Sequence, residues 1–298
     1  YVPYTALLFL VVAVTGVAVA AYHPLSSMLV GRTAAEGRGN GMMSYFIAGG
    51  NAGMAFVPLI LVAFLDCFPL RALPLLILPT ILIAALFLRS GLCAVSTLPE
   101  HAPAHPSKLS HVLFARTTVT LNLAMGLRCW THGAFGTFLP LLLVSSGEDT
   151  HAAGLFLTIF MVGGMIGGLV GGNLADVLSG RRIIVGALLL GILPCAYYFT
   201  HVSADIVGGI LLFAAGFMLM APQPSSIIWA QQALPENAGM ASGMMLGMSF
   251  GLGSLGVAAT AALGDHIGLA PALLVSVIAL PLAALLAFVT PEPGSERE

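Results

Sequence analysis

Nine apolar runs, each long enough to cross a bilayer, constrain this chain more than any other feature. A membrane-spanning helix needs about 20 apolar residues. Hydrophobic residues make up 58% of the 298 positions and charged residues 7%, far below the roughly one quarter charged in water-exposed domains. The sequence therefore predicts an all-α, polytopic membrane protein with about nine transmembrane helices. The expected spans are 5–30, 41–63, 70–88, 113–143, 152–174, 183–200, 206–231, 239–262 and 268–289.

One pattern occurs twice, at residues 22–53 and 222–256. Pro24 aligns with Pro224, and the Gly-Met-Met sequence that starts at Gly41 aligns with the one that starts at Gly243. Each copy has an apolar helix with a polar residue before a proline, a short charged loop and a second, Gly/Met-rich helix. Internal repeats of this kind are typical of transporters. Chance matches of Gly and Pro, both frequent in membrane helices, are the alternative.

The repeat also predicts the domain organisation. It begins at the first expected span and again at the seventh, so the repeating unit is six helices and two units would make twelve. The chain is therefore expected to be a fragment that lacks the first three. The predicted domains are the last three helices of an N-terminal bundle at 1–90, a cytoplasmic linker at 91–112, a complete C-terminal six-helix bundle at 113–290 and a cytoplasmic tail at 291–298. The linker is assigned because it is rich in Pro and His and has no apolar periodicity.

The positions of Lys and Arg predict the orientation, because cytoplasmic loops carry an excess of both. If the first span runs from outside to inside, only Arg71 lies outside and Arg128 lies within a span. The N-terminus is then expected outside and the C-terminus in the cytoplasm. The cytoplasmic set is Arg32, Arg38, Arg89, Lys108, Arg116, Arg181, Arg182 and Arg297.

Several function classes find no support in the sequence. The net charge is −2 and the basic residues are scattered, which argues against nucleic-acid binding. The sequence has no P-loop, G-x-S-x-G or H-E-x-x-H motif, so ATP-driven transport and common hydrolytic chemistry are not indicated. No metal site and no cofactor is expected. The cysteines are far apart and are interpreted as packing residues: Cys67, Cys93, Cys129 and Cys195.

A loop motif and two short helix motifs resemble a known family. Residues 172–182 read GNLADVLSGRR. This is similar to the G-x-L-A-D-x-x-G-R-R loop of the major facilitator superfamily, with one extra residue before Gly180. The Tyr-His-Pro at 22–24 and the GGNAG at 49–53 resemble the fosmidomycin resistance branch of drug exporters. The resemblance implies a twelve-helix fold of two bundles and a secondary transporter of the bacterial inner membrane.

Arg128 and His132 are the first candidate substrate-binding residues. A charged side chain in the middle of a span costs roughly 3 kcal/mol on insertion scales and is usually retained for function or pairing. His132 lies one turn after Arg128 on the same helix face, and a cation beside an imidazole makes a plausible anion site. The structural alternative is that Arg128 binds a backbone carbonyl or a carboxylate.

His23, Gln223 and Trp130 complete the candidate substrate set. His23 and Gln223 occupy matched repeat positions beside prolines, and the resemblance places their helices around a central cavity. A proline leaves a carbonyl of the preceding turn without a donor, which suits a polar path. For Trp130, and also for Trp229, packing or anchoring is the alternative. Asn51 and Asn122 are expected to form hydrogen bonds between helices.

The same loop motif predicts a conformational latch of Gly172, Asp176, Gly180, Arg181 and Arg182. The resemblance implies that Asp176 docks on the N-terminus of the second span, near residues 39–43, where a carboxylate is favoured. The alternative is a set of solvated loop charges. Upstream of this loop, glycines spaced every four residues predict a helix-packing strip: Gly163, Gly164, Gly167 and Gly168.

These features predict a secondary transporter that moves a small molecule by alternating access, anionic if Arg128 contacts it. The resemblance to the fosmidomycin resistance branch implies export of a drug-like compound, with proton exchange as the driving force, as in an antiporter. No carboxylate lies in mid-span, so coupling within this chain would use His23 or His132. Uptake of a metabolite is the first alternative, and an intramembrane enzyme using His23 and His132 is the second. The partners expected are the substrate, the lipid bilayer and protons, with a monomeric protein.

Overall fold

The computed structural model describes residues 5–91 and 114–292, and within these ranges every regular element is a helix. Consecutive pieces join into nine rods, which confirms the all-α prediction and the approximate span count. The rods are α1 (Thr5–Thr33), α2 (Gly39–Cys67), η1 (Leu70–Leu76) with α3 (Ile77–Arg89), α5 (Arg116–Ser145), α6 (Thr150–Ala175), α7 (Gly180–Thr200), α8 (Ile206–Met220) with α9 (Pro222–Ala233), η3 (Pro235–Asn237), α10 (Ala238–Gly243) and η4 (Met244–Met248) with α11 (Ser249–Ile267), and α12 (Leu269–Val277) with α13 (Ala279–Val289).

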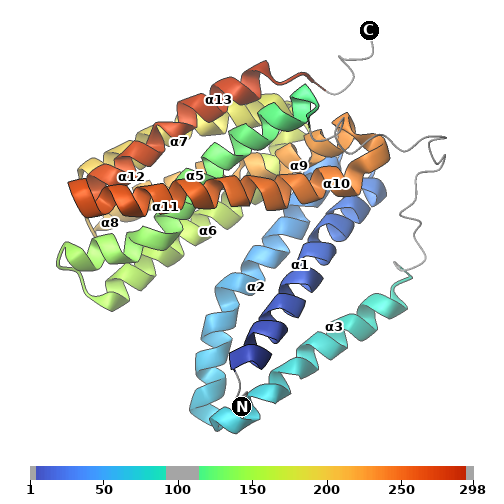
Figure 1. The fold of residues 1–298 in the computed structure, drawn as a ribbon, viewed down its shortest axis with the longest axis horizontal. Coiled ribbons are helices and arrows are strands. Elements are labelled where there is room, and N and C mark those ends of the chain that lie inside the picture. Colours follow the sequence, from blue (N-terminus) through green and yellow to red (C-terminus); the bar gives the residue numbers. More distant parts are fainter. Residues whose placement is uncertain (1–4, 92–113, 293–298) are drawn as a thin grey trace.

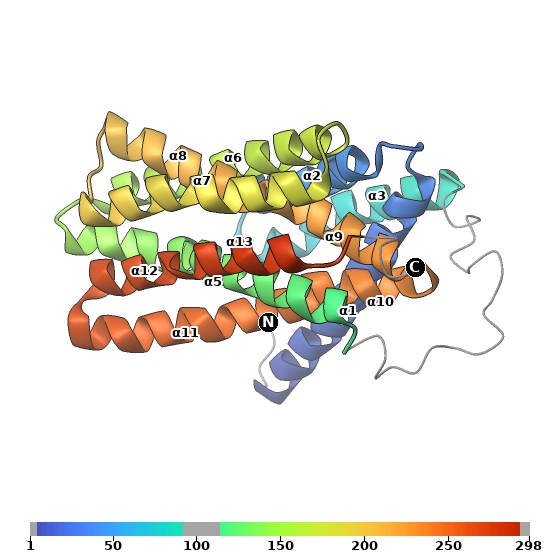
Figure 2. The ribbon, with the colours of Figure 1, turned by 90° about the horizontal axis from the view of Figure 1, so that it is seen from above.

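The helices form two parts that meet at one end. Helices α5 to α13 pack into a bundle, and α1, α2 and α3 form the N-terminal part (Figure 1). Figure 1 shows α1 and α2 touching the bundle near α9 and α10 and diverging from it along their length. The view from above shows the same junction from a second direction (Figure 2). The predicted linker lies, except for Gly91, outside the described residues, as do residues 293–298 of the tail.

Apolar side chains both fill the bundle and cover its outside. Phe135 of α5 stacks on Phe160 of α6 with ring centroids 5.0 Å apart, and on Phe199 of α7 at 4.3 Å. On the outer surface Leu193 is 74% exposed. An apolar exterior fits a chain that is surrounded by lipid. Polar backbone groups in lipid must be hydrogen-bonded within the protein, and helices meet this requirement. Seven of the described helical rods are long and apolar enough to cross a membrane.

The glycine strip of α6 lies against α8. A Cβ atom on Gly163 would lie 2.9 Å from the carbonyl carbon of Phe213, and one on Gly171 would lie 2.5 Å from the carbonyl oxygen of Ala221. Gly167 meets the backbone of Phe217 in the same way. Gly164 faces Met220, while Gly168 has more room. The two backbones therefore pack at a distance that only glycine permits.

Candidate functional site

The junction between the two parts is centred on Asp176, the residue that ends α6. Its Oδ1 accepts hydrogen bonds from the backbone N–H of Asn40 at 3.0 Å and from the Asn40 side-chain amide at 2.9 Å. Its Oδ2 accepts from the backbone N–H of Gly41 at 2.8 Å. The first N–H groups of a helix have no partner within the helix, and the helix dipole favours a negative charge there. Asp176 therefore caps α2 from the other part of the molecule.

Small residues let α6 and α2 approach closely at this junction. A Cβ atom on Gly172 would lie 2.5 Å from the Ser44 Cβ and 2.6 Å from the Asn40 carbonyl oxygen. One on Gly41 would lie 2.8 Å from Asp176 Oδ2. The Asn173 amide donates to Ser44 Oγ at 3.3 Å. Gly172 and Asp176 thus belong to one contact surface, called the α2–α6 junction below.

The rest of the predicted latch is engaged within the bundle. Arg181 Nη2 donates to the carbonyl of Thr290 at 2.6 Å, its Nε lies 3.2 Å from a Glu292 carboxylate oxygen, and its guanidinium lies 5.5 Å from the Trp229 ring centroid. Arg182 is exposed. Gly180 starts α7 beside Ser225. The loop motif grouped these residues with Asp176. In the structure Arg181 instead joins α7 to Trp229 of α9 and to Thr290 and Glu292, which follow α13.

The extra residue in the loop motif has a structural consequence at Ser179. Its φ of 145° lies in a region that residues with a side chain rarely adopt. Its Oγ accepts a hydrogen bond from the backbone N–H of Arg182 at 3.3 Å and so caps α7. The loop therefore accommodates one more residue than the family pattern by a strained turn that is stabilised by a side-chain cap.

Contacts between the two parts come in swapped pairs. A Cβ atom on Gly239 would lie 3.3 Å from Met28, and one on Gly39 would lie 3.6 Å from Ile228. Residues 28 and 228 are 200 positions apart, the offset of the repeat before its loop, and Gly39 and Gly239 both lie at the start of the helix that follows the loop. After the loop the offset is 202, so the two contacts correspond to each other to within two positions, as an approximate twofold relation between the copies would produce.

Arg128 is buried in the bundle, with 2% of its surface exposed. Its Nη1 donates to the carbonyl of Leu219 at 2.8 Å, and its Nη2 lies 3.1 Å from Cys129 Sγ. The chain is interrupted between α8 and α9 at Pro222, which supplies no N–H, so carbonyls of the last turn of α8 can accept from side chains. The hydrogen bond to the Leu219 carbonyl is what the structural alternative predicts, in which Arg128 binds a backbone carbonyl.

Three buried polar atoms near this interruption have no hydrogen-bond partner within the described ranges. They are Arg128 Nε, a donor, Gln223 Oε1, an acceptor, and Ser225 Oγ, which can do either. Gln223 is 7% exposed and follows by four positions the Leu219 residue that Arg128 binds. Buried polar groups are normally paired, so an unpaired donor and acceptor mark a place where water or a ligand can bind.

The other predicted substrate residues have separate surroundings. The Trp130 indole donates to Thr260 Oγ1 at 2.8 Å and packs on Gly256 of α11. The His132 ring lies 5.4 Å from the Phe160 ring of α6. His23 is exposed on α1. The structure therefore brings Arg128 and the α8–α9 interruption together and places His132, Trp130 and His23 against other neighbours.

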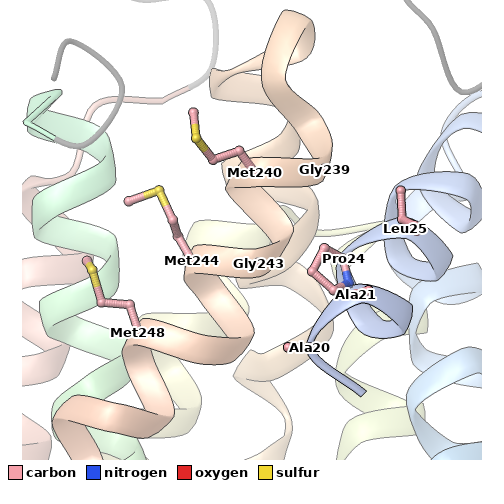
Figure 3. A pocket seen from close by; sticks show the side chains of 9 residues that line it. All are labelled: Ala20, Ala21, Pro24, Leu25, Gly239, Met240, Gly243, Met244 and Met248. Atoms are coloured by element: carbon pink, nitrogen blue, oxygen red, sulfur yellow. The ribbon is translucent and has the colours of Figure 1, made fainter. Parts of the chain in front are cut away.

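Helices of the two parts also enclose an apolar groove. It has a volume of about 530 Å³ and lies between α1 and the segment α10–η4 (Figure 3). Three methionine side chains project along one wall and Pro24 stands on the other, with His23 absent from the lining. Methionine is flexible and polarisable, and single π-helical turns such as η4 often occur at functional sites. The lining residues are Ala20, Ala21, Pro24, Leu25, Gly239, Met240, Gly243, Met244 and Met248.

Two other polar contacts between helices were not predicted from the sequence. Gln231 of α9 donates to the Ser27 carbonyl of α1 at 3.0 Å and to Ser242 Oγ of α10 at 2.8 Å. Thr131 of α5 donates to the Ser276 carbonyl of α12 at 2.7 Å. Asn122, for which an interhelical bond was expected, accepts from Ser249 Oγ at 3.1 Å. The repeat could have drawn attention to Gln231, because this long polar residue corresponds to Gly31 in the first copy.

The fold and these contacts define a class of protein: a multi-pass helical membrane protein whose two parts are joined at one end by a carboxylate on a helix N-terminus. The chain belongs to the Major Facilitator Superfamily, whose sequence pattern matches residues 1–256 and 121–298. Members of this superfamily are transporters, so the protein is a membrane transporter and not an enzyme. The predicted family is confirmed and the alternative of an intramembrane enzyme is wrong.

Named relatives and solved structures agree with this assignment. The MFS-type transporter YfnC of Bacillus subtilis is 27% identical over 302 residues, covering 95% of this chain and 70% of YfnC. The fosmidomycin resistance protein of Escherichia coli is 25% identical over 268 residues, covering 86% of this chain and 64% of that protein. The structure of the transporter FucP in the outward conformation has a TM-score of 0.68 at 18% identity, covering 92% of this chain and 72% of FucP.

Proposed function

We propose that the protein exports a small, anionic, drug-like molecule by alternating access, in exchange for protons. The observation that carries the alternating-access part is the α2–α6 junction, which joins the two parts at one end while α1 and α2 diverge from the bundle elsewhere (Figure 1). If the joined end is cytoplasmic, as the arginine distribution predicts, this arrangement corresponds to an outward-facing state. The similar FucP structure is described as outward.

The unpaired polar atoms support an anionic substrate. Arg128 is a buried cation with a free Nε–H donor, and Gln223 supplies a buried group that can contact a polar part of the same molecule. A buried guanidinium favours planar anions because it offers several donors in a fixed geometry. The methionine-lined groove can accept apolar portions of a substrate during its passage.

Export is supported by the relative that is a fosmidomycin resistance protein, whereas FucP, a fucose:proton symporter, supports the alternative of uptake. The test is to express the full-length protein in a susceptible bacterium and measure both growth in fosmidomycin and its intracellular amount. Export predicts higher tolerance and lower accumulation, and a protonophore should abolish both. Increased accumulation would favour uptake, and tolerance that survives the protonophore would remove proton coupling.

Arg128→Ala should abolish transport while leaving insertion into the membrane normal. The change removes the only charge that the described part of the chain buries within the bundle, together with the free Nε donor. Transport activity and membrane content are measured side by side in vesicles. Loss of one hydrogen bond from a positively charged side chain costs about 1.5–3 kcal/mol, so folding must be followed separately by thermal unfolding.

A matched control is Thr131→Val on the same helix. It also removes one hydrogen bond from α5 to a backbone carbonyl, that of Ser276, but changes no charge. We expect this variant to keep transport. Equal loss in both variants, or unchanged transport in Arg128→Ala, would assign Arg128 to packing alone.

A further inference from the structure

Gln231 forms a second contact between the two parts, and this contact contains no charge. The side chain is 8% exposed and comes from α9 of the bundle. Its amide Nε2 donates to the Ser27 carbonyl of α1 at 3.0 Å and to Ser242 Oγ at 2.8 Å. Ser242 Oγ in turn donates to the Ala238 carbonyl at 2.8 Å, so each member of this small network has a partner. A fully paired buried network fixes geometry, because a lost partner leaves a costly unpaired group.

Gly31 provides the space that Gln231 occupies. A Cβ atom on Gly31 would overlap Gln231 Oε1. Residues 31 and 231 are 200 positions apart, the offset that also relates Pro24 to Pro224 in the part of the repeat before its loop. Equivalent positions of two copies that face each other across a twofold axis can hold one long side chain, not two. Glycine on one copy and glutamine on the other satisfy that condition.

We propose that Gln231 and Gly31 form a clasp that holds the two parts together and sets the balance between the two states of the transport cycle. The inference rests on the alternating-access function proposed above. The clasp lies at the same end as the α2–α6 junction, since one groove is lined by Gly31, Gln231 and Gly39, the first residue of α2. Gln231 is a positioning residue: its hydrogen bond to the Ser27 carbonyl exists only while α1 touches α9, so that bond stabilises the joined state alone, whereas its bond to Ser242 lies within the bundle and holds the amide in place.

The test measures the populations of two states directly: a joined state, in which the two parts touch at the α2–α6 junction, and an open state, in which they are separated there. Spin labels at Glu36→Cys and Val177→Cys, both exposed, report the separation of the parts by double electron–electron resonance, in a background that lacks the native cysteines. Gln231→Ala removes the one side-chain hydrogen bond of Gln231 that crosses between the parts, worth about 1 kcal/mol, so the open fraction should rise about fivefold relative to the joined fraction. Gln232→Ala, the exposed neighbour, is the matched control and should leave the distance distribution unchanged.

Gly31→Ala provides an independent check. The new methyl group displaces the Gln231 amide, so this variant alone should shift the populations in the same direction. Combined with Gln231→Ala it should add nothing further, because the displaced group is already absent. Ser242→Ala, which removes the bond that holds the Gln231 amide in place within the bundle, should shift the populations in the same direction by less than about fivefold, and it replaces Gln231→Ala if that variant does not fold.

The outcome separates this proposal from the proposed function, because the distances are measured without substrate. A protein that transports but whose distance distribution is unaffected by Gln231→Ala and Ser242→Ala overturns the clasp alone. Additive effects of Gly31→Ala and Gln231→Ala would also overturn it. A wild-type protein that moves no substrate while these shifts occur overturns the transport assignment and leaves the clasp intact.

Discussion

Asp176→Ala should shift the protein from the joined to the open state by at least about 1,000-fold, since three hydrogen bonds to a charged group contribute about 1.5 kcal/mol or more each and the helix dipole adds about 0.3–1 kcal/mol. The variant removes three hydrogen bonds at once, those from the Asn40 and Gly41 backbone and from the Asn40 side chain. It also leaves the first N–H groups of α2 without a protein acceptor. The spin-label pair described for Gln231 measures the shift.

Two further carboxylate variants define the origin of the effect. Asp176→Asn keeps one acceptor but places an amide N–H₂ group against a donor, so an intermediate shift is expected. Asp205→Ala is the matched control: Asp205 also caps a helix, accepting from the Gly208 N–H at 2.8 Å, and this bond lowers the pKa of Asp205, but both groups belong to the bundle. Joined populations that are equal in wild type and Asp176→Ala would contradict the latch.

Gly167→Ala should destabilise the protein more than any other single methyl group added to α6. The added Cβ overlaps the backbone carbonyl of Phe217, which cannot rotate away as a side chain could, so α6 and α8 must separate. Overpacking of this kind costs about 1–3 kcal/mol and sometimes more. At about 2–4 °C per kcal/mol for a protein of this size, Tm should fall by roughly 2–12 °C. Thermal unfolding of the purified protein in detergent measures it.

Gly154→Ala is the matched control on the same helix. Gly154 is exposed, and a Cβ atom there would meet no other atom within 4 Å. Because alanine is a better helix former than glycine by about 1 kcal/mol, Tm should stay equal or rise slightly. A Gly167→Ala protein as stable as Gly154→Ala would show that the contact between α6 and α8 tolerates a side chain, and the packing role of the strip would be wrong.

The sequence predicted best where one physical constraint acts on neighbouring residues. Apolar runs of bilayer length located the helices, since a polar backbone in lipid must be hydrogen-bonded within its own segment. The four-residue spacing of Gly163 and Gly167 predicted a packing face, because the spacing of residues along a helix decides which of them lie on the same side. The resemblance of the loop motif at residues 172–182 implied that Asp176 docks on the start of α2.

Only the tertiary structure decided which partner each polar side chain has. Arg128 binds the Leu219 carbonyl, 91 positions along the chain, because α8 is interrupted at the depth that Arg128 reaches. Trp130 donates to Thr260, and Gln231 donates to the Ser27 carbonyl across the two parts. A sequence determines that a buried polar group must be paired, but the partner depends on which helices lie side by side, and helix packing is set by the shapes of all the faces together.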